Sequence, residues 1–529
     1  MSRPPQRLHD AIGVTVLDGL HYPQRSLLAS IGTQRVGTLS EYANLWKFTY
    51  APAWLASADR FALAPGLPLQ EGEIQDGSSF RPVQWYFDNL LPEEAQRQLM
   101  AADAGIPGAD AFALLSYYGA ESAGSLTLLA PGKSLEPGGM AELSDAQLSA
   151  RIRNLPHHSL AAGAAKRMSL AGAQHKLAVI ERDGYLLQPI GAEPSTHILK
   201  PENTSGDYPH SVVNEWFVMR LAARAGLDVP PVQRRYVPEP AFLIERFDRQ
   251  RTATGVRRVH AIDACQLLGL DRTFKYQMGS VEALARIAEL CRNKLATRFR
   301  LYRWLIFNVL TGNSDAHLKN LSFLVGPDGV HLAPHYDLLC TTCYDSLAYG
   351  SGKRPEDATL AWPILGVERF GDMNFAHMVK AGEAMGLPRK AAANLLELQR
   401  SAILDEAQQL LNQVDAENAQ VEPHAGPGCH ARRRDALFAC DHPQRRQGNG
   451  RAAVAALSPV AGNGAASPPA AASRRQPIPV LRSSAASSNG RVGDRTAAAA
   501  LHRVNLAIPA TSPASAFKGG YAIRNRTRA

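Results

Sequence analysis

The sequence predicts an α+β fold, because most strand-like segments lie before about residue 250 and the following stretch is mostly helix-like. The chain has 529 residues, of which 45% are hydrophobic and 20% charged. These values are ordinary for a globular protein and leave room for several domains. We expect boundaries that give the segments 1–135, 145–250, 251–414 and 415–529.

Residues 1–135 are expected to form a small α+β domain. Trp46, Phe48 and Tyr50 alternate with polar residues, as in a half-buried strand. Residues 93–104 and 109–118 are predicted to be helices, the first of them ending at a glycine. The Pro/Gly-rich stretch that follows, residues 130–140, indicates a connection between domains.

The segment 145–250 is expected to form a small antiparallel sheet covered by one amphipathic helix. Apolar residues recur close to every 3.6 positions between 212 and 225, and a glycine follows. The predicted strands are 176–180, 185–188, 197–200 and 241–247.

Residues 251–414 are predicted to be mostly helical, with helices at 281–291, 299–310 and 375–414. One β-hairpin interrupts them, because two apolar runs flank Pro327-Asp328-Gly329.

After Asp415 the composition changes to Ala, Pro, Ser, Gly and Arg without a sustained period, which predicts a disordered tail. Residues 421–529 hold 16 Lys/Arg and 4 Asp/Glu, whereas residues 1–420 hold 41 and 44. The net charge of +9 therefore comes from the tail, and the main body is a poor nucleic-acid binder by itself.

No signal-peptide pattern and no run of eighteen apolar residues is present, so we expect a cytoplasmic protein without membrane attachment. The six cysteines are too few for a disulfide scaffold. Cys340 and Cys343 have ligand-like spacing, but a second such pair is missing, which favours ordinary thiols over a zinc site.

The segment Asn313–Asn320, which we name the Asp315 loop, precedes the hairpin and contains an Asp-x-x-x-x-Asn spacing. Protein kinases use this spacing in the loop where the Asp accepts the substrate hydroxyl proton and the Asn holds Mg²⁺. Asn320 and Asp337 stand at similar distances on either side of the hairpin turn, so an antiparallel pairing brings them together. Their two oxygen ligands suit a Mg²⁺ ion shared with nucleotide phosphates.

A kinase also needs a flexible loop over the phosphates and a lysine that neutralises them. Residues Ser169–Lys176, here named the glycine loop, can supply the first, although they form no Walker A motif. Lys200 at a strand end can supply the second, with Glu215 as its partner. Backbone groups of Glu245 and Phe247 could read an adenine edge.

Each of these residues also has an ordinary structural explanation. Asp315 is typical of a turn or helix cap, and Asn320 and Asp337 of strand ends. Lys200 could be a strand-end lysine with its amine in solvent. His317 could be a structural hydrogen-bonding residue rather than a phosphate contact.

Six segments, taken in order and spacing, resemble the HipA toxin kinases of bacteria. They are Ser169–Lys176, Ser195–Lys200, Asn214-Glu215, Phe242–Asp248, Asn313–Asn320 and Tyr336-Asp337. The N-terminal part is similar in residues 36–39, 50–55, 87–92 and 119–124. The resemblance covers about residues 30–412 and leaves the tail unmatched.

The resemblance implies a bilobal fold related to protein kinases, with an N-terminal subdomain, an ATP-binding small lobe and a helical catalytic lobe in the three segments before the tail. It implies Asp315 as the catalytic base, Asn320 and Asp337 on Mg²⁺, and Ser169 as the autophosphorylated serine. The residues implied to surround ATP are Gly172, Gln174, Lys176, Lys200, Glu245, Phe247 and His317. One departure is His175, where family members often carry Glu.

The resemblance further implies a serine/threonine protein kinase that acts as the toxin of a toxin–antitoxin pair. Its expected partners are a helix-turn-helix antitoxin of the HipB type, DNA mainly through that antitoxin, and a protein substrate such as an aminoacyl-tRNA synthetase. Two alternatives stay open from the residues: a kinase that phosphorylates a small molecule, and an inactive corepressor that only binds its antitoxin.

Overall fold

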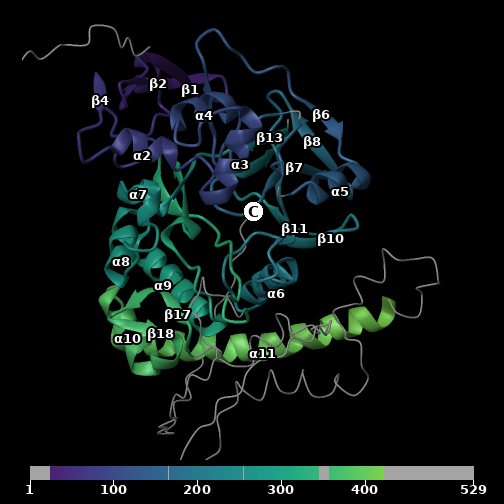
Figure 1. The fold of residues 1–529 in the computed structure, drawn as a ribbon. Helices are drawn as coiled ribbons and strands as arrows, with labels where there is room; N and C mark the ends of the chain where they lie inside the picture. Colours follow the sequence, from purple (N-terminus) through teal and green to yellow (C-terminus); the bar gives the residue numbers. More distant parts are fainter. Residues whose placement is uncertain (1–23, 156, 165, 254, 345–356, 422–529) are drawn as a thin grey trace, which may run out of the picture.

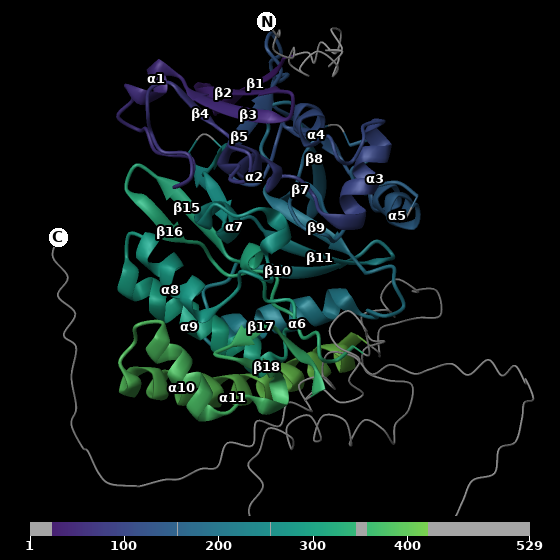
Figure 2. The same ribbon diagram turned by 60° about the vertical axis from the view of Figure 1, so that its left-hand side comes forward.

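The structure is a computed structural model, and it describes residues 24–421 apart from residues 156, 165, 254 and 345–356. Two antiparallel sheets occupy one end of the molecule and a group of helices occupies the other (Figures 1 and 2). The predicted α+β class and its two-lobed arrangement are confirmed.

The first sheet has five strands in the order β4-β3-β2-β1-β5. Trp46, Phe48 and Tyr50 all point into its buried face, as their alternation predicts. Helix α3 ends at Gly105, which adopts a left-handed conformation with φ of 64°. The elements are β1 (Arg25–Ile31), β2 (Gln34–Tyr42), β3 (Leu45–Tyr50), α1 (Pro52–Leu55), β4 (Glu73–Gln75), α2 (Pro82–Asp88), α3 (Glu94–Ala104), α4 (Ala111–Tyr118) and β5 (Leu126–Leu129).

The second sheet has six strands in the order β10-β11-β9-β7-β8-β6. Its edge strand β6 overlaps the end of the predicted interdomain connection and pairs with β8. Helix α6 packs against β10 and β11 through its apolar face, which includes Trp216 and Phe217. The elements are β6 (Gly139–Glu142), α5 (Asp145–Arg153), β7 (Leu177–Arg182), β8 (Tyr185–Ile190), β9 (His197–Pro201), α6 (Ser211–Arg224), β10 (Val232–Tyr236) and β11 (Pro240–Glu245).

The remaining lobe is mostly helical and contains the predicted hairpin as β15 and β16. Val325 pairs with Val330 across the turn, and Gly329 takes a φ of 115° that the turn requires. The longer elements are β12 (Arg249–Thr252), β13 (Gly255–Arg258), β14 (Ala261–Asp263), α7 (Ala264–Leu268), α8 (Val281–Leu290), α9 (Lys294–Thr311), β15 (Ser322–Gly326), β16 (Gly329–Leu332), β17 (Thr359–Ile364), β18 (Val367–Arg369), α10 (Phe375–Ala384) and α11 (Arg389–Val421). Short 3₁₀ turns cover Arg272–Phe274, Leu318–Asn320 and Phe370–Asp372.

Helix α11 continues to Val421, past the change in composition at Asp415. The predicted disordered tail otherwise falls on residues 422–529, which lie outside the described residues. Across the described parts of the chain, no helix combines the length and apolar character needed to cross a bilayer.

A buried ionic cluster joins the first domain to the second sheet. Glu121 is fully buried and contacts Lys166 at 2.7 Å and Arg249 at 2.7 Å. Asp248, three residues after β11 ends, pairs with Arg246 and accepts a hydrogen bond from the backbone N–H of Gly124. This cluster therefore fixes the end of β11 against the N-terminal domain.

Changing Glu121 to Gln should lower the free energy of unfolding by about 3 kcal/mol, because breaking a buried ion pair leaves the opposite charge uncompensated. Burial raises the pKa of Glu121, but Arg249 and Lys166 outweigh it and hold that pKa well below its usual range. The carboxylate is thus charged at neutral pH. Urea unfolding measures the effect.

Glu73→Gln is the matched control, since Glu73 pairs with Lys47 on the surface at 2.8 Å. Exposed pairs contribute less than about 1 kcal/mol. Equal losses in the two variants would contradict a structural role for the cluster.

Candidate active site

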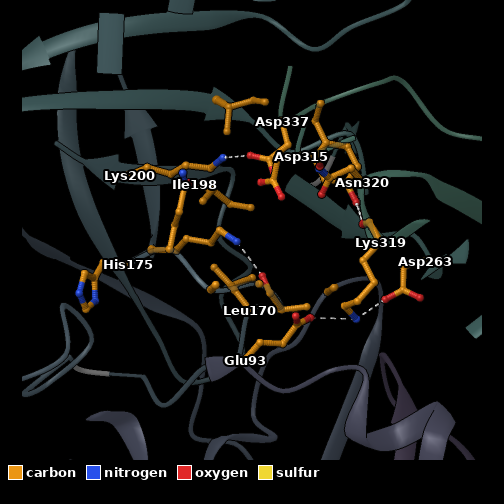
Figure 3. A pocket seen from close by; sticks show the side chains of 18 of the residues that line it. Glu93, Leu170, His175, Ile198, Lys200, Asp263, Asp315, Lys319, Asn320 and Asp337 are labelled. Atoms are coloured by element: carbon orange, nitrogen blue, oxygen red, sulfur yellow. Dashed lines mark hydrogen bonds and ion pairs between the residues drawn. The ribbon is translucent and has the colours of Figure 1, made fainter. Parts of the chain in front are cut away.

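A cavity of about 560 Å³ lies where the N-terminal domain, the second sheet and the helical lobe meet. This volume is within the range of small-molecule sites. Its walls include residues 89–95 of the first domain, the glycine loop, strands β9 and β11, residues 261–266 and 275–276, and the Asp315 loop with Asp337. Figure 3 shows Lys200, Asp337, Asp315 and Asn320 gathered in this cavity.

The glycine loop leads into strand β7. Gly172 has a φ of 107°, and a Cβ atom at this position would collide with the Lys176 amine. The Lys176 Nζ atom donates to the Ala171 carbonyl at 2.7 Å. The positive φ therefore favours glycine at this position, whereas the flexible end of the Lys176 side chain could move away from a Cβ atom.

Lys200 connects three elements of the site. It projects from β9 and donates to Glu215 Oε1 on α6 at 2.7 Å and to Asp337 Oδ1 at 2.5 Å. Burial lowers the pKa of Lys200, but the carboxylates of Asp337 and Glu215 outweigh burial and raise that pKa. Burial raises the pKa of Asp337, but the amines of Lys200 and Lys176 outweigh burial and hold that pKa well below its usual range. Both groups are therefore charged, and the predicted pairing of Lys200 with Glu215 is present.

The Asp315 loop follows the end of α9, which Gly312 caps in a left-handed conformation. The Tyr276 hydroxyl donates to Asp315 Oδ1, and Trp362 Nε1 holds the adjacent Ala316 carbonyl at 3.1 Å. Burial raises the pKa of Asp315. Such a carboxylate, held by a neighbour in a cavity, can accept a proton.

Asn320 and Asp337 face the same cavity, as the hairpin predicts. The Asn320 amide nitrogen donates to the Asp315 carbonyl at 2.8 Å, so its side-chain oxygen is the atom available to a cation. One carboxylate and one amide oxygen fit Mg²⁺ when phosphate and water complete the shell. Within the described residues, no group of three His, Cys, Asp or Glu side chains is suited to hold a metal ion. Cys340 and Cys343 are among the residues searched and belong to no such group.

Two aromatic residues also line the cavity: Phe247 stacks on Tyr336 with ring centroids 5.5 Å apart. Glu245 also lines the cavity, but its N–H donates to the Pro231 carbonyl at 3.1 Å. In this conformation, only the Glu245 carbonyl and the backbone of Phe247 would remain to form hydrogen bonds with the edge of an adenine base.

Ten of the eleven predicted site residues line this one cavity. They are Gly172, Gln174, Lys176, Lys200, Glu245, Phe247, Asp315, His317, Asn320 and Asp337. Ser169, the first residue of the glycine loop, is instead buried at 1% exposure, and its hydroxyl donates to the Leu90 carbonyl at 2.7 Å. His175 lines the cavity too, but Figure 3 shows its ring turned away from Asp337.

Sequence reasoning missed several charged residues of the site. Glu93, Asp263, Lys275 and Lys319 all line the cavity and are mostly buried. Of these four, only Lys319 could have been found from the sequence, because it directly precedes the predicted cation ligand Asn320.

If the cavity binds ATP, as the family resemblance implies, its nucleotide affinity should fall as the pH rises above 8, because burial and nearby Lys200 lower the pKa of Lys176 to about 8. The amine is charged below that pH and neutral above it, so we expect about 10-fold weaker ATP binding at pH 9 than at pH 7. Lys176→Arg should remove this dependence, because a guanidinium stays charged. Calorimetric titration with ATP measures it.

Lys133→Arg, at an exposed position, is the matched control and should keep the wild-type dependence. An unchanged pH dependence in Lys176→Arg would show that another group is responsible.

Comparison with known proteins gives two family matches. The family described as the HipA-like C-terminal domain matches residues 168–410, and the family described as the HipA N-terminal domain matches residues 27–129. Together these ranges include every residue of the predicted site.

Curated relatives match over most of their length. The chain is 37% identical over 373 residues to "Putative kinase Y4mE" of Sinorhizobium fredii, which covers 67% of this chain and 85% of the relative. It is 32% identical over 340 residues to "Serine/threonine-protein kinase toxin HipA" of Shewanella oneidensis, which covers 60% and 75%. A solved Shewanella oneidensis complex of HipA, HipB and operator DNA contains a chain that matches with a TM-score of 0.62 at 25% identity, over 78% of this chain and 94% of that one.

Proposed function

Because the chain belongs to the HipA family of serine/threonine-protein kinase toxins, we propose that it transfers the γ-phosphate of ATP to a Ser or Thr hydroxyl of a protein. The observation that carries this proposal is the convergence of Lys200, Asp315 and Asp337 in one cavity. These residues come from separate segments, and together they provide a phosphate-binding cation, a proton acceptor and a cation ligand.

In the proposed reaction, the acceptor oxygen forms a bond to the γ-phosphorus while the bond from that phosphorus to the β–γ bridging oxygen breaks. Asp315 takes the proton of the acceptor hydroxyl, and ADP leaves. Lys200 and Lys176 neutralise the phosphates, and Lys200 turns from Asp337 toward them. A Mg²⁺ ion bound with ATP would supply charge neutralisation at the phosphates, and Asn320 and Asp337 would hold it.

We propose that Ser169 is a site of autophosphorylation. Its hydroxyl is buried and bonded to Leu90 in this conformation, so the glycine loop has to leave its place before Ser169 can accept phosphate. A phosphoryl group carries nearly two negative charges, and returning them to a position that is 1% exposed would cost their solvation by water. Modification of Ser169 would therefore keep the loop displaced and weaken ATP binding.

We propose a HipB-type helix-turn-helix antitoxin as the binding partner. The solved relative stands in a complex with HipB and operator DNA. Residues 1–420 are nearly neutral in charge, which favours DNA contact mainly through such an antitoxin. The family resemblance makes an aminoacyl-tRNA synthetase the first acceptor protein to test.

The direct test is incubation of the purified protein with Mg²⁺, γ-labelled ATP and a cell lysate. We expect label on a lysate protein and on the chain itself, and expect Ser169→Ala to lose the label on the chain. Label on a diffusible metabolite would identify a small-molecule kinase instead. No transfer at all, with antitoxin binding retained, would identify an inactive corepressor.

A further inference from the structure

We propose that Glu93, which belongs to the N-terminal domain, is a positioning residue of the active site that holds the glycine loop and the Asp315 loop in register. The inference rests on the proposed kinase function. It assigns the N-terminal domain a part in phosphoryl transfer, although that domain contributes none of the predicted catalytic or metal-binding residues.

The backbone of this segment holds the glycine loop. Pro92 forms a parallel β-bridge with Gly172, and the Glu93 N–H donates to the Gly172 carbonyl at 3.2 Å. Three residues earlier, the Leu90 carbonyl accepts the Ser169 hydroxyl. Residues 90–93 thus contact the glycine loop at two points.

The side chain of Glu93 reaches the opposite wall of the cavity. Its Oε1 atom lies 3.5 Å from the amine of Lys319, which directly precedes Asn320 (Figure 3). Its Oε2 atom lies 2.8 Å from the amine of Lys275. One residue therefore contacts the glycine loop through its backbone and the catalytic side through its carboxylate.

Lys275 transmits this contact to the proton acceptor. Its carbonyl accepts the Leu318 N–H at 3.1 Å, inside the Asp315 loop. The next residue, Tyr276, donates its hydroxyl to Asp315. A shift of Lys275 would therefore move both the backbone of the Asp315 loop and the group that orients the Asp315 carboxylate.

Charge and burial favour this positioning role over ligand contact. Glu93 is 3% exposed, and although burial raises its pKa, Lys319 and Lys275 outweigh burial and lower that pKa to about 2. A permanently negative carboxylate in a cavity proposed to hold ATP would repel the phosphates. The favourable interactions of Glu93 are therefore those with Lys275 and Lys319.

Neither lysine depends on Glu93 alone. Lys319 also contacts Asp263 at 2.5 Å, and Lys275 also contacts Glu94 at 3.3 Å. Removing the Glu93 charge therefore leaves each lysine with a carboxylate partner, and Glu93→Gln keeps both the shape and the backbone bond to Gly172. This variant is expected to fold.

The test compares Glu93→Gln, Lys275→Met and the double variant, with Glu73→Gln in the same domain as the matched control. Glu93→Gln should lower kcat about 10-fold, because small misplacement of reacting groups has effects of this size or larger. The KM for ATP should stay within about threefold, since the glycine loop keeps its backbone contact. Glu73→Gln should match the wild type.

If Glu93 and Lys275 act as one unit, the double variant should also lose only about 10-fold in kcat. A loss near 100-fold, which independent destabilising effects would give, or a wild-type kcat in Glu93→Gln, would overturn the proposal.

Hydrogen–deuterium exchange separates this inference from the kinase proposal itself. Glu93→Gln should speed exchange in residues 169–176 and 313–320, and Glu73→Gln should not. A wild-type protein without kinase activity would refute the proposed function, and exchange would then decide the positioning role. Unchanged exchange in both loops would refute that role.

Discussion

Asp315→Asn is expected to lower kcat for protein phosphorylation by about 10³-fold, because a positioned general base contributes roughly 10² to 10⁴ in rate. An amide cannot take the proton that the acceptor hydroxyl loses. The change is otherwise mild, since Asn has the same shape and its side-chain oxygen can still accept the Tyr276 hydroxyl. Label transfer from ATP to the acceptor, followed over time, measures the rate.

The affinity for ATP should survive this substitution, because the phosphate-binding groups Lys176 and Lys200 are unchanged. The wild type should also lose activity as the pH falls through the raised pKa of Asp315, since a protonated carboxyl cannot act as a base. Asp328→Asn, in the exposed hairpin turn, is the matched control. Full activity of Asp315→Asn would remove Asp315 from the mechanism.

Asp337→Asn is expected to lower kcat/KM for ATP by about 10³-fold at a fixed Mg²⁺ concentration, because charge stabilisation by a bound cation contributes several kcal/mol. Asp337 has a φ of 57°, a left-handed conformation that Asn tolerates better than most residues. Replacement by Asn therefore removes the negative charge without straining the backbone. Replacement by Ala would remove the charge and also strain the backbone.

The loss should appear in ATP affinity as well as in rate, which distinguishes this variant from Asp315→Asn. Equilibrium titration with ATP, at several Mg²⁺ concentrations, measures the affinity. Lys200 keeps Glu215 as a partner, so the fold should be retained. If Mg²⁺ dependence and ATP affinity are both unchanged in Asp337→Asn, the proposed cation site is wrong.

The local structure around the site could be predicted because it depends on patterns along the chain. The Pro-Asp-Gly turn predicts the hairpin β15–β16, and the spacing of Asn320 and Asp337 about that turn places both at one end. The same reasoning predicts β9 and α6, which bring Lys200 and Glu215 within 2.7 Å.

Strand β10 was missed, because its residues Gln233, Arg234 and Arg235 are polar and show no apolar alternation. In the structure the guanidinium of Arg234 lies 3.7 Å from the centre of the Trp216 ring on α6. A charged residue that covers an aromatic ring can occupy a packed position, and only the tertiary contact shows this.

The sequence by itself determined the strands and helices that carry the site and the order of the motifs along them. Periodicity and turn residues act over a few positions, so they are readable without the fold. The tertiary structure alone decided how Glu93 meets Lys275 and Lys319, and how Glu121 meets Lys166 and Arg249. Pairing of charges from distant segments depends on which groups are buried together, and no local pattern encodes that burial.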